Sequence, residues 1–211
     1  SENPTPDEEL RRTQLIAHET AHMWFGDLVT MNWFDDVWTK EVFANYFAAL
    51  ITEPLFPQVN HQLNWMKTYT AASLSEDRTP GTTAIRQPLD NLQNAGLIYG
   101  QIIYNKAPVM MVKTGGINGK RSISGRDSRI FKTYAYANAT WDDLIQILDS
   151  KTEQDLAAFS DVWVNQKGMP IIKFEISDKQ LTIHQQDPYQ RGLKLASKIQ
   201  YHPLRNKGHN D

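Results

Sequence analysis

The sequence predicts a mainly α fold, in which a pair of helices is followed by a helical bundle and a short C-terminal β segment. Up to residue 167, apolar residues recur mostly with the period of an α-helix, and capping residues, glycines and prolines separate the runs. From residue 171 the pattern changes to an alternation of period two, which is typical of strands. With 40% hydrophobic residues, the 211-residue chain can bury a core.

The first two predicted helices are marked by their ends. Thr5-Pro6-Asp7-Glu8 has the form of a capping box with proline at the first helical position, and this helix is expected to stop near Gly26. Asp35 or Asp36 is the expected cap of the second helix, which should end before Pro54.

The later helices follow from the same signals. A third helix is expected from Gln58 to about Leu74. The stretch 75–95, rich in Pro, Thr, Gly and Asn, is the longest expected loop and a candidate wall of a cleft. Further helices are predicted over 97–112 with a bend at Pro108, and over 128–136, 141–150 capped by Thr140, and 154–167.

Two domains are therefore predicted. Residues 1–168 form a helical part, and residues 169–211 form a β segment that could begin a β-sandwich domain. The β segment starts with a hairpin, because Ile172, Phe174 and Ile176 alternate with polar residues.

Composition excludes several classes of partner. The formal charge is -2, with 22 basic and 24 acidic residues scattered along the chain, so nucleic acid is not expected to bind. No apolar run reaches the roughly 18 residues that span a bilayer, so the chain is expected to be soluble. The absence of cysteine excludes disulfides and thiolate metal ligands. Both a cytoplasmic location and export after removal of a leader stay open, as does the oligomeric state.

One motif carries chemistry: His18-Glu19-Thr20-Ala21-His22. On a helix, this spacing places both imidazoles on one face. A catalytic zinc site needs three protein ligands and one open position, and Glu41, separated from His22 by 18 residues, is the candidate third ligand. Glu19 is placed to act as general base. We therefore expect one Zn²⁺ per chain and peptide or protein substrates.

The neighbourhood of this motif makes it specific. The segment HETAHMWFGDLVTMNWFDDVWTKEVFA resembles the zinc-binding signature of the aminopeptidase N family of metallopeptidases, which are gluzincins with the pattern HExxH-x18-E. The matching positions are Trp24-Phe25-Gly26, Leu28-Val29-Thr30, Trp33, Trp38, Glu41 and Phe43-Ala44. The resemblance covers roughly residues 8–185. It implies a thermolysin-like pair of catalytic helices and aminopeptidase activity in the intact protein.

A second match assigns Tyr104. The stretch Ile98-Tyr99-Gly100-Gln101-Ile102-Ile103-Tyr104-Asn105-Lys106 resembles the family segment that carries the catalytic tyrosine. By this resemblance, the phenol of Tyr104 would stabilise the oxyanion of the tetrahedral intermediate. Taken without the resemblance, a lone tyrosine on an amphipathic helix favours core packing.

The sequence also departs from the family. Lys40 and Val42 flank Glu41 where the family commonly has Asn and Gly. The Gly-Ala-Met-Glu-Asn strand, whose Glu holds the substrate amine, has no match here. The resemblance thus implies a piece of a larger enzyme, with apolar surface exposed.

Three alternatives stay open. The chain could be an inactive helical scaffold or partner-binding domain that lacks the amine anchor. It could also belong to an endopeptidase, or to a related hydrolase that acts on a non-peptide bond.

Other polar residues are expected to play no part in the site. The remaining histidines show no metal spacing and are interpreted as surface or core residues: His61, His184, His202 and His209. Asn45 and Arg86 are expected to face solvent, although Asn45 could hydrogen-bond a ligand and Arg86 could line the cleft. Asn138-Ala139-Thr140 reads as a glycosylation sequon, but the helix cap at Thr140 explains it better.

Overall fold

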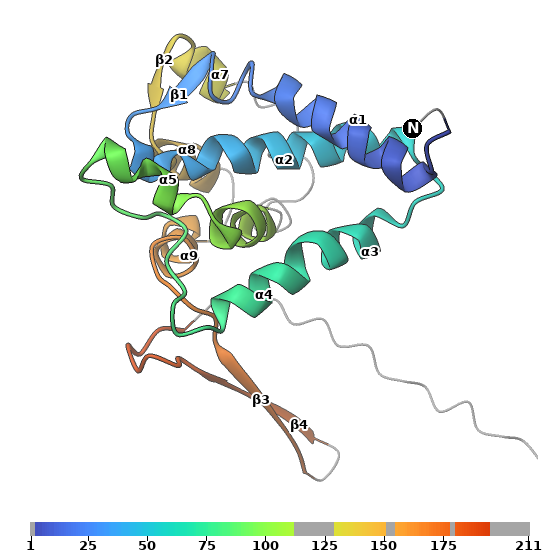
Figure 1. Ribbon diagram of the computed structural model, residues 1–211. Coiled ribbons are helices and arrows are strands. Elements are labelled where there is room, and N and C mark those ends of the chain that lie inside the picture. The colour runs from blue at the N-terminus through green and yellow to red at the C-terminus, as the bar shows by residue number, and fades with distance from the viewer. Residues whose placement is uncertain (1–2, 112–128, 151–154, 178–179, 195–211) are drawn as a thin grey trace, which may run out of the picture.

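The computed structural model describes residues 3–111, 129–150, 155–177 and 180–194, and it is mainly α, as predicted (Figure 1). The helical elements are α1 (Pro6–Ala21), η1 (Phe34–Asp36), α2 (Trp38–Thr52), η2 (Glu53–Leu55), α3 (His61–Trp65), η3 (Met66–Thr70), α4 (Ala71–Asp77), η4 (Leu92–Asn94), α5 (Ala95–Ile98), η5 (Ile102–Lys106), α7 (Arg129–Tyr134), α8 (Trp141–Asp149) and α9 (Leu156–Trp163). The strands are β1 (Val29–Met31), β2 (Ala137–Ala139), β3 (Ile171–Ser177) and β4 (Gln180–Gln186). Of the η elements, η3 and η5 are π-helical and the others are 3₁₀ turns.

Helix α1 begins with the predicted capping box. The Glu8 amide donates to the Thr5 hydroxyl (3.3 Å), and the Thr5 amide donates to the Glu8 carboxylate (2.7 Å). The helix ends at Ala21, earlier than the expected stop near Gly26. His22 is its C-cap, and the chain then turns back through Gly26, which has φ +132° and donates its amide to the Val29 carbonyl. This backbone conformation favours glycine.

The predicted cap of the second helix is wrong. Helix α2 follows η1 directly, and Val37 at its N-cap position makes no side-chain capping bond. Asp36 is instead buried. Its carboxylate accepts the main-chain amide of Trp141 (3.1 Å) and pairs with the guanidinium of Arg86 (2.9 Å). A partner far along the chain therefore overrides the local capping preference.

The third predicted helix is present but shifted. It begins after Asn60, whose side chain caps the amide of Leu63 (3.0 Å), and it continues through α3, η3 and α4 to Asp77.

The predicted helix over 97–112 is divided into two parts. Tyr99 has an extended ψ of 110°, which ends α5, and a π-turn over η5 follows, with the Ala107 amide donating to the Ile102 carbonyl. This wide turn stands directly before Pro108, which has no amide hydrogen.

A short parallel pair of strands joins two distant segments. Strand β1 pairs with β2 in the register Val29–Ala137 to Met31–Ala139, and neither strand was predicted. The side-chain amide of Asn138 donates to the Met31 carbonyl (2.7 Å). The predicted cap after β2 is confirmed, because Thr140 and Asp143 form a capping box at the start of α8.

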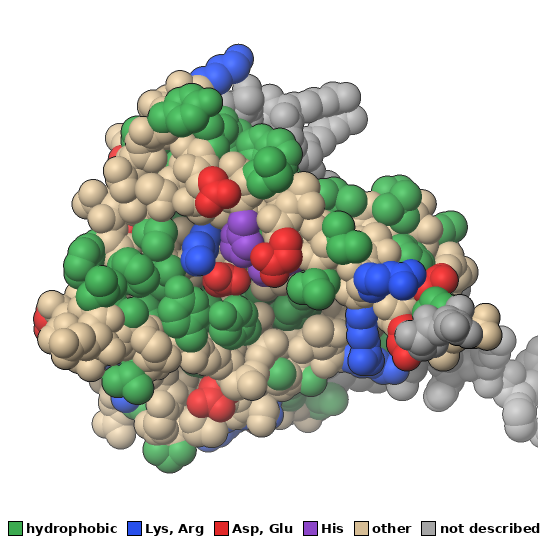
Figure 2. All heavy atoms as spheres, turned by 45° about the horizontal axis from the view of Figure 1, so that its top comes forward, with side chains coloured by type: hydrophobic (Ala, Val, Ile, Leu, Met, Phe, Trp, Pro, Cys, Tyr) green, Lys and Arg blue, Asp and Glu red, His purple; other side chains and the backbone are tan. Residues whose placement is uncertain are grey.

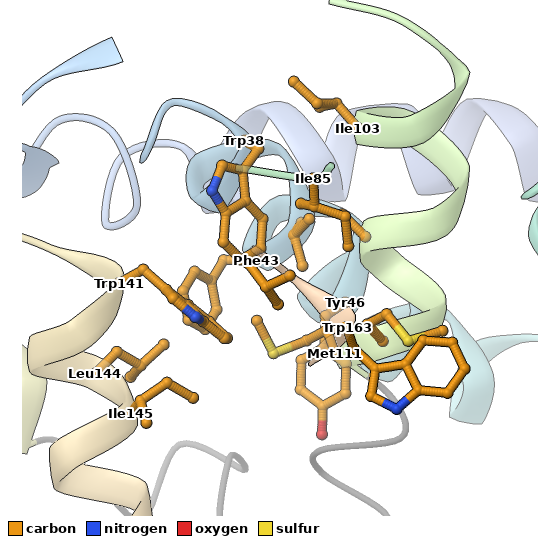
Figure 3. Packing of buried hydrophobic residues seen from close by; sticks show 14 of the residues in the cluster. Trp38, Phe43, Tyr46, Ile85, Ile103, Met111, Trp141, Leu144, Ile145 and Trp163 are labelled. Carbon is orange, nitrogen blue, oxygen red and sulfur yellow. The ribbon is translucent and has the colours of Figure 1, made fainter. Parts of the chain in front are cut away.

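The hydrophobic core lies between α2, η5, α8 and α9 (Figure 3). The rings of Trp38 and Trp141 pack with their centroids 4.7 Å apart. Ile85, from the loop between α4 and η4, is fully buried, and its amide donates to the Val164 carbonyl (3.1 Å). This loop therefore contributes a buried side chain to the hydrophobic core.

Arg86 belongs to the same loop, and the expectation that it faces solvent is wrong. Its guanidinium joins buried Asp36 to exposed Asp142 at distances of 2.9 Å. Since it bridges the start of α2 and the start of α8, Arg86 is a structural residue.

A buried ion pair ties η5 to α4. The Lys106 ammonium lies 2.9 Å from the Asp77 carboxylate, and both side chains are almost inaccessible to solvent. The same carboxylate also accepts the Thr82 hydroxyl (3.0 Å) and the Gly168 amide (3.1 Å). Burial lowers the pKa of Lys106, and the Asp77 charge opposes this effect.

The C-terminal hairpin is confirmed. Strands β3 and β4 pair antiparallel from Ile171–Gln186 to Ser177–Gln180, and they project away from the helices (Figure 1). Phe174 and Ile176 are exposed on it. The division at residue 168, and the sandwich domain expected to follow, stay predictions.

Within the described ranges, no helix combines the length and apolar character needed to cross a membrane.

Candidate metal centre

Helices α1 and α2 pack against each other and bring the three predicted ligands together. The Nε2 atoms of His18 and His22 are 3.1 Å apart, and the Oε2 atom of Glu41 lies 3.5 Å from the first and 3.8 Å from the second. All three potential ligand atoms lie within 4.8 Å of one another. Two helices thus present two imidazoles and one carboxylate to a single point.

This geometry fits a zinc ion. Tetrahedral zinc with bonds of about 2.0–2.2 Å holds neighbouring ligand atoms about 3.3 Å apart. The three separations between the ligand atoms lie close to that value. Two histidines and one carboxylate are also a donor set used by catalytic zinc sites that keep a position open for water or substrate.

The outer nitrogens of both imidazoles are hydrogen-bonded. The Nδ1 atom of His22 lies 3.1 Å from the carbonyl oxygen of Phe25, which only accepts. The Nδ1 atom of His18 lies 3.0 Å from Oδ1 of Asn45. The expectation that Asn45 faces solvent is therefore wrong: it is half-buried beside a candidate ligand.

Neighbouring charges shift the pKa values of His18 and Glu41 in opposite directions. The adjacent Glu41 carboxylate raises the pKa of His18 against the effect of burial. Burial favours the neutral acid of Glu41, yet contact with His18 and the charge of Lys40 lower its pKa, so Glu41 is ionised. The Lys40 ammonium lies 3.5 Å from Oε1, the carboxylate oxygen that does not face the imidazoles.

Glu19 lies next to His18 on α1, and its side chain is exposed. Both residues line a cavity of about 910 Å³ between the α1–α2 pair and the α3–η3 helix. Trp65, Tyr69 and Tyr46 supply aromatic surface to this cavity. In Figure 2, histidine side chains lie in a hollow among acidic side chains, with hydrophobic side chains beside it. The candidate base Glu19 thus faces this cavity.

Tyr104 lies on η5, which packs against α2. Its ring stacks on that of Tyr99 with centroids 6.2 Å apart, and 40% of the residue is exposed, so it is not a core residue. Burial raises the pKa of Tyr104, and the negative charge of Glu41 adds to this effect. The phenol is therefore protonated at neutral pH and able to donate a hydrogen bond.

The predicted cleft wall takes no part in the cavity. The described residues that line this cavity come from α1, α2, η2, α3 and η3 and from Val109, and none of them comes from the stretch 75–95. Of the other histidines, His61 contacts the Phe56 carbonyl and also lines the cavity, and exposed His184 lies 3.4 Å from Glu175. His202 and His209 lie outside the described residues.

Apolar residues are exposed along α1 and the turn after it, as expected: Leu15, Ile16, Met23 and Trp24. Each of them is between 46% and 61% exposed.

Comparison with known proteins agrees with this geometry. Residues 1–163 match the Peptidase family M1 domain. Aminopeptidase N of Lactococcus lactis subsp. lactis is 32% identical over 185 residues, which are 87% of this chain and 22% of that protein. Aminopeptidase N of Lactobacillus delbrueckii subsp. lactis is 31% identical over 172 residues, 81% of this chain and 20% of that protein. Leucyl aminopeptidase of Saccharolobus solfataricus is 25% identical over 179 residues, 85% and 23% respectively.

The chain spans about a fifth of the length of these relatives. The family match covers every described helix from α1 to α9, including the three candidate ligands, Glu19 and Tyr104. Because more than half of the chain matches the M1 domain, and because its relatives are aminopeptidases, the chain belongs to peptidase family M1, as its resemblance to aminopeptidase N predicted.

Proposed function

We propose that this chain carries the metal centre and catalytic groups of a zinc-dependent metallopeptidase, and that the whole protein is an aminopeptidase. The observation that carries the proposal is the convergence of His18, His22 and Glu41 within 4.8 Å, with His18 and Glu19 lining a large cavity. The names of the relatives support the aminopeptidase assignment.

His18, His22 and Glu41 would hold the zinc ion. Zinc bound by such ligands lowers the pKa of a water molecule and polarises a peptide carbonyl. Glu19 lies beside the ligands without being one of them, so its carboxylate can accept a proton from the attacking water and pass it to the leaving amine. Its exposure to the cavity supports this role.

Tyr104 would donate its phenolic hydrogen bond to the oxyanion that forms on the substrate carbonyl. A donor aimed at a developing negative charge acts mainly in the transition state. The raised pKa of Tyr104 keeps the proton on the phenol through the neutral range.

The first experiment measures the zinc content of the purified chain at pH 7.5 after dialysis against a weak chelator. About one zinc per chain is expected, and its loss is expected in Glu41→Gln. Glu53→Gln is a matched control, because Glu53 lines the same cavity on η2 without belonging to the ligand cluster. Equal zinc content in the unmodified chain and in Glu41→Gln contradicts the proposed site.

The second experiment measures turnover of fluorogenic peptides by the full-length protein. Glu19→Gln is expected to lower kcat by roughly 10²–10⁴-fold with zinc retained, as for loss of a general base. Tyr104→Phe should lower kcat by roughly 10²–10³-fold, as for loss of an oxyanion donor. Tyr99→Phe, which keeps the ring stacked on Tyr104, should retain activity.

The same assay tests substrate class. A peptide with a free amino terminus should be cleaved, and its acetylated counterpart should not. Cleavage of both peptides at internal bonds would assign an endopeptidase. Zinc binding with no cleavage of either peptide would contradict the peptidase.

A further inference from the structure

The two candidate histidine ligands differ in the hydrogen-bond partner of their Nδ1 atoms, and for His18 this partner is the side chain of Asn45. The outer nitrogen of His22 faces a main-chain carbonyl, whereas that of His18 faces the side chain of Asn45. Asn45 lies one helical turn after Glu41 on α2, so the same helix supplies a ligand and a hydrogen-bond partner for another ligand. Only the contact of His18 can be changed by a side-chain substitution.

We propose that Asn45 is a positioning residue of the metal centre: its amide oxygen keeps the proton of His18 on Nδ1 and leaves Nε2 free to bind the metal. This inference rests on the proposed function for its role in the enzyme. The contact itself is a property of the metal-free chain.

The chemistry of the contact supports this orientation. An amide oxygen only accepts hydrogen bonds, so the Nδ1 atom at 3.0 Å must be the donor. In a neutral imidazole the other nitrogen then carries a lone pair. The lone pair of Nε2 faces the space shared with Nε2 of His22 and Oε2 of Glu41.

The opposite amide orientation has a different consequence. If Asn45 donated through its nitrogen, His18 would carry its proton on Nε2. That proton would point between His22 and Glu41, which lie 3.1 and 3.5 Å away, and would close the metal position. The position of one proton on His18 therefore separates a centre ready to bind metal from one that is not.

The hydrogen bond between Asn45 and His18 should also affect the affinity of the centre for zinc. Residues that hydrogen-bond a ligating histidine typically change metal affinity by about 10–100-fold when they are replaced. A neutral amide stabilises the ligand less than a carboxylate in the same place. Asn45→Leu should therefore weaken zinc binding, and Asn45→Asp should strengthen it.

The first test measures zinc dissociation constants by competition with a chromophoric chelator at pH 8. The expected order of affinity is Asn45→Asp, then the unmodified chain, then Asn45→Leu, with a step of about tenfold or more to the leucine variant. Asn64→Leu is the matched control, because Asn64 lines the same cavity on α3, and it should bind as the unmodified chain does. Equal affinity of Asn45→Leu and the unmodified chain overturns the proposal.

The second test needs no metal. Long-range ¹H–¹⁵N spectra of the metal-free chain at pH 8 report which nitrogen of His18 carries the proton, with His18→Gln used to assign the signals. Nδ1 should be protonated in the unmodified chain, and Asn45→Leu should shift the proton toward Nε2. A proton on Nε2 of the unmodified chain overturns the inference.

The two tests also separate this inference from the proposed function. If the unmodified chain binds no zinc but shows the Asn45-dependent proton on Nδ1, the positioning role stands and the zinc site fails. Circular dichroism shows whether Asn45→Leu folds. If it does not fold, the comparison of Asn45→Asp with the unmodified chain decides, and weaker zinc binding by the aspartate variant overturns the proposal.

Discussion

Lys40 stands beside the candidate ligand Glu41, where the signature that this segment resembles commonly has Asn. Its ammonium lies 3.5 Å from the outer oxygen of Glu41, so a positive charge stands next to a candidate metal ligand. That charge attracts the carboxylate away from a bound cation and repels the cation itself. Lys40 should therefore lower the affinity of the candidate site for zinc.

Replacing Lys40 by methionine, which keeps the aliphatic stem, should tighten zinc binding by on the order of tenfold, since the side chain is only partly screened by solvent. The measurement is chelator competition at low and high salt. Lys67→Met, at an exposed position of η3, serves as the control for the loss of a charge elsewhere. Unchanged affinity at low salt would show that Lys40 turns away from the centre.

Breaking the buried pair of Asp77 and Lys106 should strongly destabilise the fold. Asp77→Ala leaves a buried ammonium without its counter-charge and leaves the Thr82 hydroxyl and Gly168 amide without an acceptor. The expected loss is about 3–5 kcal/mol of unfolding free energy. Urea unfolding measures it, with Asp161→Ala on the exposed side of α9 as control. A loss under about 1 kcal/mol would mean that water reaches Lys106.

At this scale the sequence predicted the convergence of His18, His22 and Glu41 better than the contacts around them. The spacing from His18 to His22 and on to Glu41 carries geometric information, because it places all three on two adjacent helices. The position of Asn45 one helical turn after Glu41 allows a contact with a ligand without favouring it, and Asp36 carries no such signal. Asn45 meets His18 only because α1 packs on α2 in one particular way, and Asp36 is buried by a partner 105 residues later.

The elements that the sequence located best are those with side-chain caps. The boxes at Thr5 and Thr140 mark the starts of α1 and α8. Strands β1 and β2 have three residues each, too few for an alternating pattern, and their pairing depends on contacts between segments more than 100 residues apart. The π-turns of η3 and η5 lie inside ordinary helical sequence, so periodicity alone predicts α-helix there.

Helix α8 provides a test of the cap at Thr140. The hydroxyl of Thr140 accepts the Asp143 amide (3.2 Å) directly before Trp141, which packs against Trp38 in the core. Thr140→Ala should cost about 1 kcal/mol of unfolding free energy. Chemical unfolding measures this change, with exposed Thr133→Ala on α7 as control. An equal effect in both variants would contradict the role of the cap.

Across the whole molecule, a metal at this centre would join the N-terminal helix to the core. Helix α1 packs on α2, and Leu15 and Ile16 on α1 and Met23 and Trp24 in the turn after it are exposed, so much of the apolar surface of this segment remains in water. Its two imidazoles and the carboxylate on α2 would be linked by one ion. Zinc should therefore stabilise the folded chain as well as complete its site.

Thermal unfolding at increasing zinc concentration tests this linkage. A ligand that binds only the folded state at about 100 times its Kd adds about 2.7 kcal/mol. For a domain of this size, each kcal/mol raises Tm by roughly 2–4 °C, so a rise of roughly 5–10 °C is expected. Glu41→Gln should show a much smaller rise, because one of the two helices then contributes no ligand. An equal rise in both proteins would place the bound zinc outside the α1–α2 pair, and the centre would then not be what joins these helices.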